Sequence, residues 1–211
     1  MDVVVIGGHG KVARRLLGLL LERGHGARGV IRNPDHAADL ESLGAESFVC
    51  DIEAGELTGA VRGADAVVFA AGAGPGSGAE RKQSVDYGGA VKLIEACRAN
   101  QIRRYVMVSS INADDPKSWS EKMRPYFEAK AAADTELERA GLDHTIARPG
   151  FLSDEPGTGK VTAAPEVPRG EIPRDDVALV LAEVLEADST IGKAFDVVSG
   201  ETPVKAAIAA L

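Results

Sequence analysis

The chain has 211 residues, of which 45% are hydrophobic, and a formal net charge of −8 at pH 7. This length suits one large domain with its own hydrophobic core. The acidic balance disfavours nucleic acid as a partner, because phosphate binding needs clustered Lys and Arg. Cys50 and Cys97 share no spacing with each other or with the four histidines that is typical of a disulfide framework or a zinc site, so we expect no bound metal.

The N-terminal region starts directly on a strand-like run at residues 3–6, without the basic and apolar regions of an export signal. The apolar stretches of the chain are about half as long as a bilayer-spanning helix. We therefore expect a cytoplasmic protein that acts on a small molecule and has no membrane partner. The sequence leaves open whether it is a monomer or a homodimer.

Short runs rich in Val, Ile and Ala alternate with longer segments of helical period, which is typical of βαβ units around a parallel sheet. Continuous apolar runs predict central strands that helices cover on both faces. In chain order, the strands are expected at 3–6, 66–71, 105–108, 144–147 and 194–198, and the helices near 10–23, 34–43, 81–100, 125–140 and 175–186. The sequence thus predicts an α/β, doubly wound, mainly parallel sheet with helices on both faces.

Two loops interrupt this pattern, one rich in Gly at 72–78 and one rich in Pro and Gly at about 154–173. We expect residues 1–211 to form a single domain. Within it, residues from about 151 onward are expected to contribute a small cap on the substrate side.

The turn after the first strand carries glycines at the spacing of a dinucleotide-binding motif, with Ala13 in the third position. Glycine lets the backbone approach a pyrophosphate closely, and the N-terminus of the following helix offers free N–H groups and a positive dipole. Tight strand-to-helix turns also use glycine for steric reasons alone. We interpret the turn as a nucleotide site formed by Gly7, Gly8, His9, Gly10, Lys11 and Val12.

About twenty-two positions after Gly10, the chain lacks the carboxylate that NAD-preferring proteins use to bind the ribose hydroxyls. The chain has Arg32 there. Its guanidinium, helped by Lys11, matches the geometry of a 2′-phosphate, whereas the alternative is a solvated cation at a strand end. The sequence favours NADP as the cofactor and leaves NAD possible.

Two further strand ends are candidates for contacts with the nucleotide. Asp51 can accept a hydrogen bond from the adenine amino group and Ile52 can cover the ring, although Asp51 can equally cap the following turn. Small residues after the next strand leave space for a ribose or pyrophosphate, although close packing of the glycine-rich loop explains them too. These small residues are Ala70, Ala71 and Gly72.

Tyr126 and Lys130 lie four residues apart on one face of a predicted helix. A neighbouring ammonium stabilises the phenolate of a tyrosine, which makes the phenol a better acid–base group near neutral pH, and a lysine can also hold the nicotinamide ribose. Ser109 and Ser110 follow a central strand at the edge where doubly wound folds bind ligands. We expect one of these two hydroxyls to hold a substrate carbonyl beside Tyr126, and we count Ser109 among the residues beside the cofactor.

Over nearly its whole length the chain resembles the short-chain dehydrogenase/reductase superfamily, specifically its atypical NmrA-like and biliverdin-reductase-B-like branch. The resemblance rests on the glycine turn, the Tyr126/Lys130 pair and the segments 32–34, 85–89, 105–110, 145–152 and 174–178. It implies a Rossmann core with Ser110, Tyr126 and Lys130 at the reaction centre. It also implies that Pro149, Gly150, Phe151 and Leu152 lie beside the nicotinamide.

The leading hypothesis is an NADP-dependent oxidoreductase that transfers a hydride between the nicotinamide and a small carbonyl, quinone or related acceptor. An NAD(P)-dependent sugar epimerase or dehydratase is a second possibility, which the short C-terminal part disfavours because a sugar nucleotide needs a larger cap. The third is a non-catalytic NmrA-like sensor of NADP(H), which the Ser/Tyr/Lys set disfavours.

Overall fold

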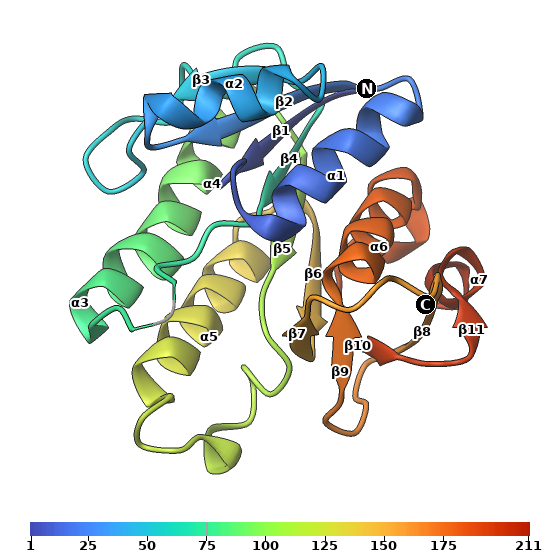
Figure 1. Cartoon of the computed structure of the whole chain (residues 1–211). Helices are drawn as coiled ribbons and strands as arrows, with labels where there is room; N and C mark the ends of the chain where they lie inside the picture. The colour runs from blue at the N-terminus through green and yellow to red at the C-terminus, as the bar shows by residue number, and fades with distance from the viewer. Residues whose placement is uncertain (75) are drawn as a thin grey trace.

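A nine-stranded sheet runs through the molecule in the order β11-β8-β10-β6-β5-β4-β1-β2-β3 (Figure 1). The computed structural model describes residues 1–74 and 76–211, so Pro75, in the expected glycine-rich loop, lies outside the described residues. Within the sheet, the neighbouring strands β10, β6, β5, β4, β1, β2 and β3 pair in parallel. At the other edge, β8 pairs antiparallel with β10 and with β11. This order is that of a Rossmann fold and confirms the predicted fold class.

The strands of the main sheet are β1 (Asp2–Ile6), β2 (Gly26–Ile31), β3 (Glu46–Val49), β4 (Ala66–Phe69), β5 (Arg104–Val108), β6 (Asp143–Pro149), β8 (Lys160–Ala164), β10 (Lys193–Ser199) and β11 (Thr202–Pro203). A separate parallel pair is formed by β7 (Phe151–Ser153) and β9 (Glu171–Pro173).

The α-helices are α1 (Lys11–Glu22), α2 (Ala37–Glu41), α3 (Ala79–Arg81), α4 (Gly89–Ala99), α5 (Arg124–Arg139), α6 (Arg174–Glu186) and α7 (Val204–Ala209). A π-helical turn (Lys82–Gly88) joins α3 to α4, and short 3₁₀ turns occur at Pro34–His36, Pro116–Ser118 and Asp188–Thr190.

Helices cover both faces of the sheet and create two hydrophobic cores (Figure 1). On one face, Val3, Val5 and Val68 point toward α1 and α6. On the other, Phe69 and Tyr105 pack with residues of α4 and α5. Alternate residues of β1 and β4 therefore serve opposite cores, which explains why these strands read as continuous apolar runs.

The structure contains elements that were not predicted from the sequence. The segment 154–173, expected as a loop, also contains β8 and β9, and β7, β11 and α7 were not predicted. The expected helix at 81–100 is interrupted by the π-helical turn. In the part of the chain that the structure describes, no helix combines the length and apolar character needed to cross a membrane.

Candidate active site

A cavity of about 430 Å³ opens where β1, β2 and β4 end. Because these strands are parallel, their carboxyl ends meet at one edge of the sheet, where doubly wound folds bind ligands. The cavity is lined by the predicted residues Gly7, His9, Gly10, Arg32, Asp51, Ile52, Ala70, Ala71 and Gly72. It is also lined by residues that the sequence analysis did not select, which include Asn33, His36, Glu53, Ala73, Arg81 and Val85.

At the glycine turn of the cavity, Gly7 and Gly8 lie too close to neighbouring backbone to carry a side chain. Gly7 has φ +81°, and a Cβ there would lie 2.8 Å from Cα of Ala71. A Cβ on Gly8 would lie 2.6 Å from Cα of Gly29 on β2. Gly10 precedes α1, and no side chain among the described residues caps the first N–H groups of that helix. Gly7 and Gly8 therefore have the steric role that the sequence left open, because they pack closely against neighbouring backbone, and the uncapped N–H groups at the start of α1 are the donors that a pyrophosphate requires.

Three charged side chains gather at the rim of the cavity. Glu53 Oε2 lies 3.3 Å from Arg81 Nη2 and 3.9 Å from Arg32 Nη1. The other carboxylate oxygen, Oε1, accepts a hydrogen bond of 2.6 Å from the Ser84 hydroxyl. The buried Nε of Arg81 has no hydrogen-bond partner among the described residues. This unpartnered donor, together with the glycine turn, fits a phosphorylated nucleotide in the cavity.

Asp51 and Ile52 line the same cavity. Asp51 Oδ1 accepts a hydrogen bond of 2.9 Å from the backbone N–H of Glu53, so the carboxylate stabilises the turn after β3. The turn-capping role that the sequence left open is thus present in the structure. A contact with adenine stays a prediction.

The remaining residues of the predicted phosphate turn have partners elsewhere. His9 stacks on His36, with ring centroids 3.6 Å apart, and its Nε2 lies 2.7 Å from Asp39 Oδ2. This hydrogen bond lowers the pKa of the exposed Asp39 carboxyl. Lys11 Nζ lies 2.6 Å from Asp154, and Val12 packs in the core.

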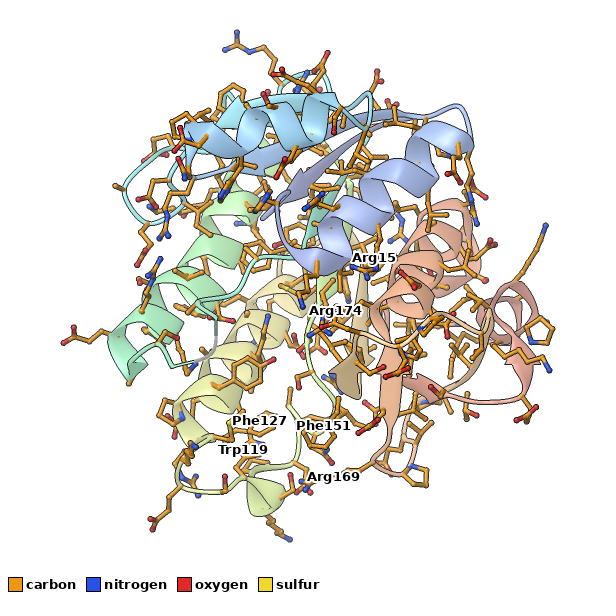
Figure 2. The ribbon with its side chains drawn as sticks, in the orientation of Figure 1. Arg15, Trp119, Phe127, Phe151, Arg169 and Arg174 are labelled. Carbon is orange, nitrogen blue, oxygen red and sulfur yellow. The ribbon has the colours of Figure 1, made fainter. Side chains whose placement is uncertain are left out.

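Asp154 connects the glycine turn to the C-terminal part of the chain. Besides Lys11, it pairs with Arg174 Nη1 at 2.8 Å. Arg15 pairs with Asp175 nearby, and Figure 2 shows Arg15 and Arg174 between α1 and α6. These ion pairs fix the segment after β7 next to the start of α1.

Lys130 of the predicted reaction centre is almost fully buried. Its ammonium donates a hydrogen bond of 3.0 Å to the carbonyl of Val108, at the end of β5, and lies 3.5 Å from Asp86 Oδ1. Asp86, on the π-helical turn, is also buried and accepts a hydrogen bond of 2.9 Å from the N–H of Ala73. The lysine charge is therefore balanced by a carboxylate that the sequence analysis missed, because Asp86 lies far from Lys130 in the chain.

Tyr126 and Ser110 lie near this lysine at the same end of the sheet. The Tyr126 ring centroid is 6.0 Å from Lys130 Nζ and 5.5 Å from Lys82 Nζ. Ser110, two residues after the end of β5, is half-buried, and among the described residues its hydroxyl has only a long contact of 3.5 Å to the carbonyl of Ile111. Both side chains have the exposure that contact with a small substrate requires.

Ser109 has a different environment, because its hydroxyl donates a hydrogen bond of 2.9 Å to the buried Asp134. Asp134 also accepts one of 3.1 Å from Arg148 Nε, and Arg148 pairs with Asp114 of the loop after β5. Burial raises the pKa of the Asp134 carboxyl to about 6, against the opposing effect of the Arg148 guanidinium. The group ties α5 and β6 to the loop that follows Ser110.

Pro149 and Gly150 are buried where β6 ends, whereas Phe151 and Leu152 on β7 are exposed. Phe151 is 66% exposed, which is unusual for a phenylalanine. The backbone N–H of Phe151 donates to the carbonyl of Gly170, which joins the start of β7 to the loop before β9.

Two further aromatic side chains, Trp119 and Phe127, lie across from Phe151. Trp119 stacks on Phe127 with centroids 5.8 Å apart, and its indole N–H donates to the carbonyl of Asn112. Arg169 Nη2 donates to the carbonyl of Ser118, which joins the two sides. Figure 2 shows Trp119 and Phe127 near the start of α5 with Phe151 and Arg169 across from them. We call Trp119, Phe127, Phe151 and Arg169 the aromatic rim.

No group of three or more His, Cys, Asp or Glu side chains that could hold a metal ion occurs among residues 1–74 and 76–211.

Comparison with known proteins identifies the family. The chain matches the NAD(P)H-binding family over residues 7–188 and belongs to it. It is 40% identical to the "Uncharacterized sugar epimerase YhfK" of Bacillus subtilis (strain 168), over 99% of both chains.

Two solved structures share the fold and the length of the chain. One, from Bacillus halodurans and provisionally named an NAD-dependent epimerase/dehydratase, is 42% identical over 100% of both chains, with a TM-score of 0.96. The other, the oxidoreductase ylbE from Lactococcus lactis, is 26% identical over 100% of this chain and 96% of that one, with a TM-score of 0.89. The chain is thus an NAD(P)-binding Rossmann protein of oxidoreductase-like type, consistent with the atypical branch expected from its sequence.

Proposed function

We propose that the protein is an NADP-dependent oxidoreductase that transfers a hydride between the nicotinamide and a small carbonyl, quinone or related acceptor. One observation carries the proposal. The glycine-turn cavity and the Tyr126/Lys130 pair lie at the same edge of the sheet, and the partly exposed Ser110 follows β5 at that edge. A nucleotide site and a proton-transfer group at one edge are what reduction of a carbonyl needs.

The residues divide into those that hold the cofactor and those that act on the acceptor. The glycine turn and the start of α1 would hold the pyrophosphate, Arg32 the 2′-phosphate, and Pro149 to Leu152 the nicotinamide end. When bound, NADPH supplies the hydride. Tyr126 donates the proton to the acceptor oxygen, and Ser110 donates a hydrogen bond to the same oxygen. Lys130, held by Asp86 and Val108, would stabilise the phenolate of Tyr126, whose ring centroid lies 6.0 Å from its Nζ.

Turnover of NADPH over a panel of quinones, flavins, aldehydes and ketones tests the chemistry. We expect Tyr126→Phe to reduce kcat by about 100-fold or more on the best acceptor, because the proton donor is lost. The affinity for NADPH should stay within about twofold of wild type. Tight NADPH binding without turnover on any acceptor would contradict the proposal and favour a non-catalytic sensor.

The cofactor preference has its own test in Arg32. Removal of a guanidinium that binds the 2′-phosphate should weaken the binding of NADP⁺ by about tenfold or more and leave the binding of NAD⁺ almost unchanged. The measurement is the ratio of the two dissociation constants for wild type and Arg32→Ala. An unchanged ratio would show that Arg32 is only a solvated cation.

The aromatic rim supports a planar acceptor. Phe151 exposes most of its ring, and Arg169 lies on the same side, which suits the planar conjugated ring of a quinone. Phe151→Ala should raise KM for a quinone such as menadione several-fold. Because the ring is exposed, its loss should leave the melting temperature nearly unchanged. An unchanged KM would show that the aromatic rim does not contact the substrate.

A sugar epimerase that retains its cofactor is the second candidate, favoured by the names of the relatives from B. subtilis and B. halodurans. Such an enzyme returns its hydride to the substrate and consumes no NADPH. Interconversion of nucleotide sugars without net change in absorbance at 340 nm would support it over the first proposal.

A further inference from the structure

We infer that Arg81 is a second ligand of the cofactor's 2′-phosphate and that Glu53 weakens NADP binding by competing for both arginines. This inference rests on the proposed function, since it concerns the same nucleotide cavity. It adds two residues that no nucleotide-binding spacing in the sequence indicates.

Arg81 reaches the cavity from a different part of the chain than Arg32. Arg32 directly follows β2, whereas Arg81 ends α3, beyond β4 and the glycine-rich loop. Both line the cavity, and both face the same oxygen of Glu53, at 3.9 Å and 3.3 Å. Two guanidinium groups around one anionic oxygen are the arrangement in which arginines bind a phosphate.

The position between the two arginines is already taken by a carboxylate. Glu53 is held there by the Ser84 hydroxyl, at 2.6 Å, and is less exposed than either arginine. A dianionic phosphate that reaches the arginines must displace this carboxylate or lie beside it, and either outcome costs binding free energy. The carboxylate does not use every donor of Arg81, because Nε is buried without a partner among the described residues.

The arrangement predicts opposite effects for two substitutions. Arg81→Ala removes a phosphate ligand and should weaken the binding of a nucleotide that has a 2′-phosphate. It should leave the binding of a nucleotide without this group unchanged. Glu53→Gln keeps the size and the hydrogen bond with Ser84 and removes the negative charge. Glu53→Gln should therefore strengthen the binding of the nucleotide with the 2′-phosphate.

The experiment is calorimetric titration of the whole protein with 2′,5′-ADP and with 5′-AMP. These probes differ in the 2′-phosphate and contain no nicotinamide, so no acceptor is needed. We expect Arg81→Ala to weaken the binding of 2′,5′-ADP about tenfold and Glu53→Gln to strengthen it about threefold. The dissociation constant of 5′-AMP should stay within about twofold of wild type in both variants. Arg139→Ala, which removes an exposed arginine of α5 outside the cavity, is the matched control and should change neither.

Each alternative outcome has a definite meaning. Binding of both probes by wild type with an affinity ratio that Arg81→Ala does not change would overturn the role of Arg81. Weaker 2′,5′-ADP binding in Glu53→Gln would show that Glu53 supports the nucleotide and overturn its competing role. Equal loss of both probes in either variant would indicate a merely structural role. Failure of wild type to bind either probe would overturn the nucleotide site itself, and with it the proposed function.

Discussion

Buried charge is the main feature of the individual residues around the proposed reaction centre. Lys130 and Asp86 are both buried and lie 3.5 Å apart, and Asp134 and Arg148 form a second buried pair beside them. Such pairs add little net stability, but removal of one partner leaves an uncompensated buried charge. We therefore interpret them as devices that hold Lys130 and the loop after Ser110 in place.

Asp134 predicts a pH dependence of stability. Its pKa is raised by burial from 3.8 to about 6 in the folded chain, so the folded state binds this proton more tightly than the unfolded state does. The stabilising contribution of protonation is full below about pH 4 and is lost as the pH rises through 6. Its size is about 2 to 3 kcal/mol.

Denaturant unfolding of wild type and Asp134→Asn from pH 4 to pH 7.5 measures this contribution. The free energy of unfolding of wild type should fall relative to that of the variant as the pH rises. A difference between the two proteins that does not vary with pH would show that Asp134 stays ionised throughout.

The sequence predicted the local part of the site and missed the part built by distant residues. The glycine turn was predictable because its function depends on consecutive residues between one strand and one helix. Glu53 and Arg81 were not, because their partners come from other segments of the chain. The carboxylate partner of Lys130 was hidden for the same reason.

Among the elements, the segment from α3 to α4 differs most from its predicted form. A regular helix was expected over 81–100, but a π-helical turn occupies Lys82–Gly88. This turn carries Asp86, which pairs with Lys130, and Ser84, which holds Glu53. π-Helical turns inside helices occur frequently at functional sites, and this one connects the cofactor cavity to the reaction centre.

The junction of β1 and α1 gives a prediction with an internal control. Gly8→Ala brings a Cβ to within 2.6 Å of the Gly29 backbone, so the turn must move away from β2. We expect a lower melting temperature and loss of NADP⁺ binding. Gly18→Ala, on α1 with nothing within 4 Å of the added Cβ, should instead stabilise the protein by about 0.5–1 kcal/mol and leave binding unchanged. Unimpaired NADP⁺ binding by Gly8→Ala would contradict the close approach at this turn.

In the molecule as a whole, the parallel core of the sheet was predictable and its antiparallel edge was not. Strands covered on both faces have an unmistakable apolar run, as at Val3 to Ile6. β8 lies near the edge and alternates buried with exposed residues over a few positions, and β11 has only two residues. Such short segments carry too little periodicity to separate them from a loop.

The transfer of hydride from the nicotinamide tests the proposed activity most directly. NADPH labelled with deuterium on one or the other face of C4 is incubated with wild type and the acceptor panel, and the NADP⁺ formed is analysed by mass spectrometry. One labelled form should lose its deuterium and the other should keep it, because a fixed site removes hydride from a single face. Retention of reduced, labelled NADPH with every carbonyl, quinone and flavin would contradict the account.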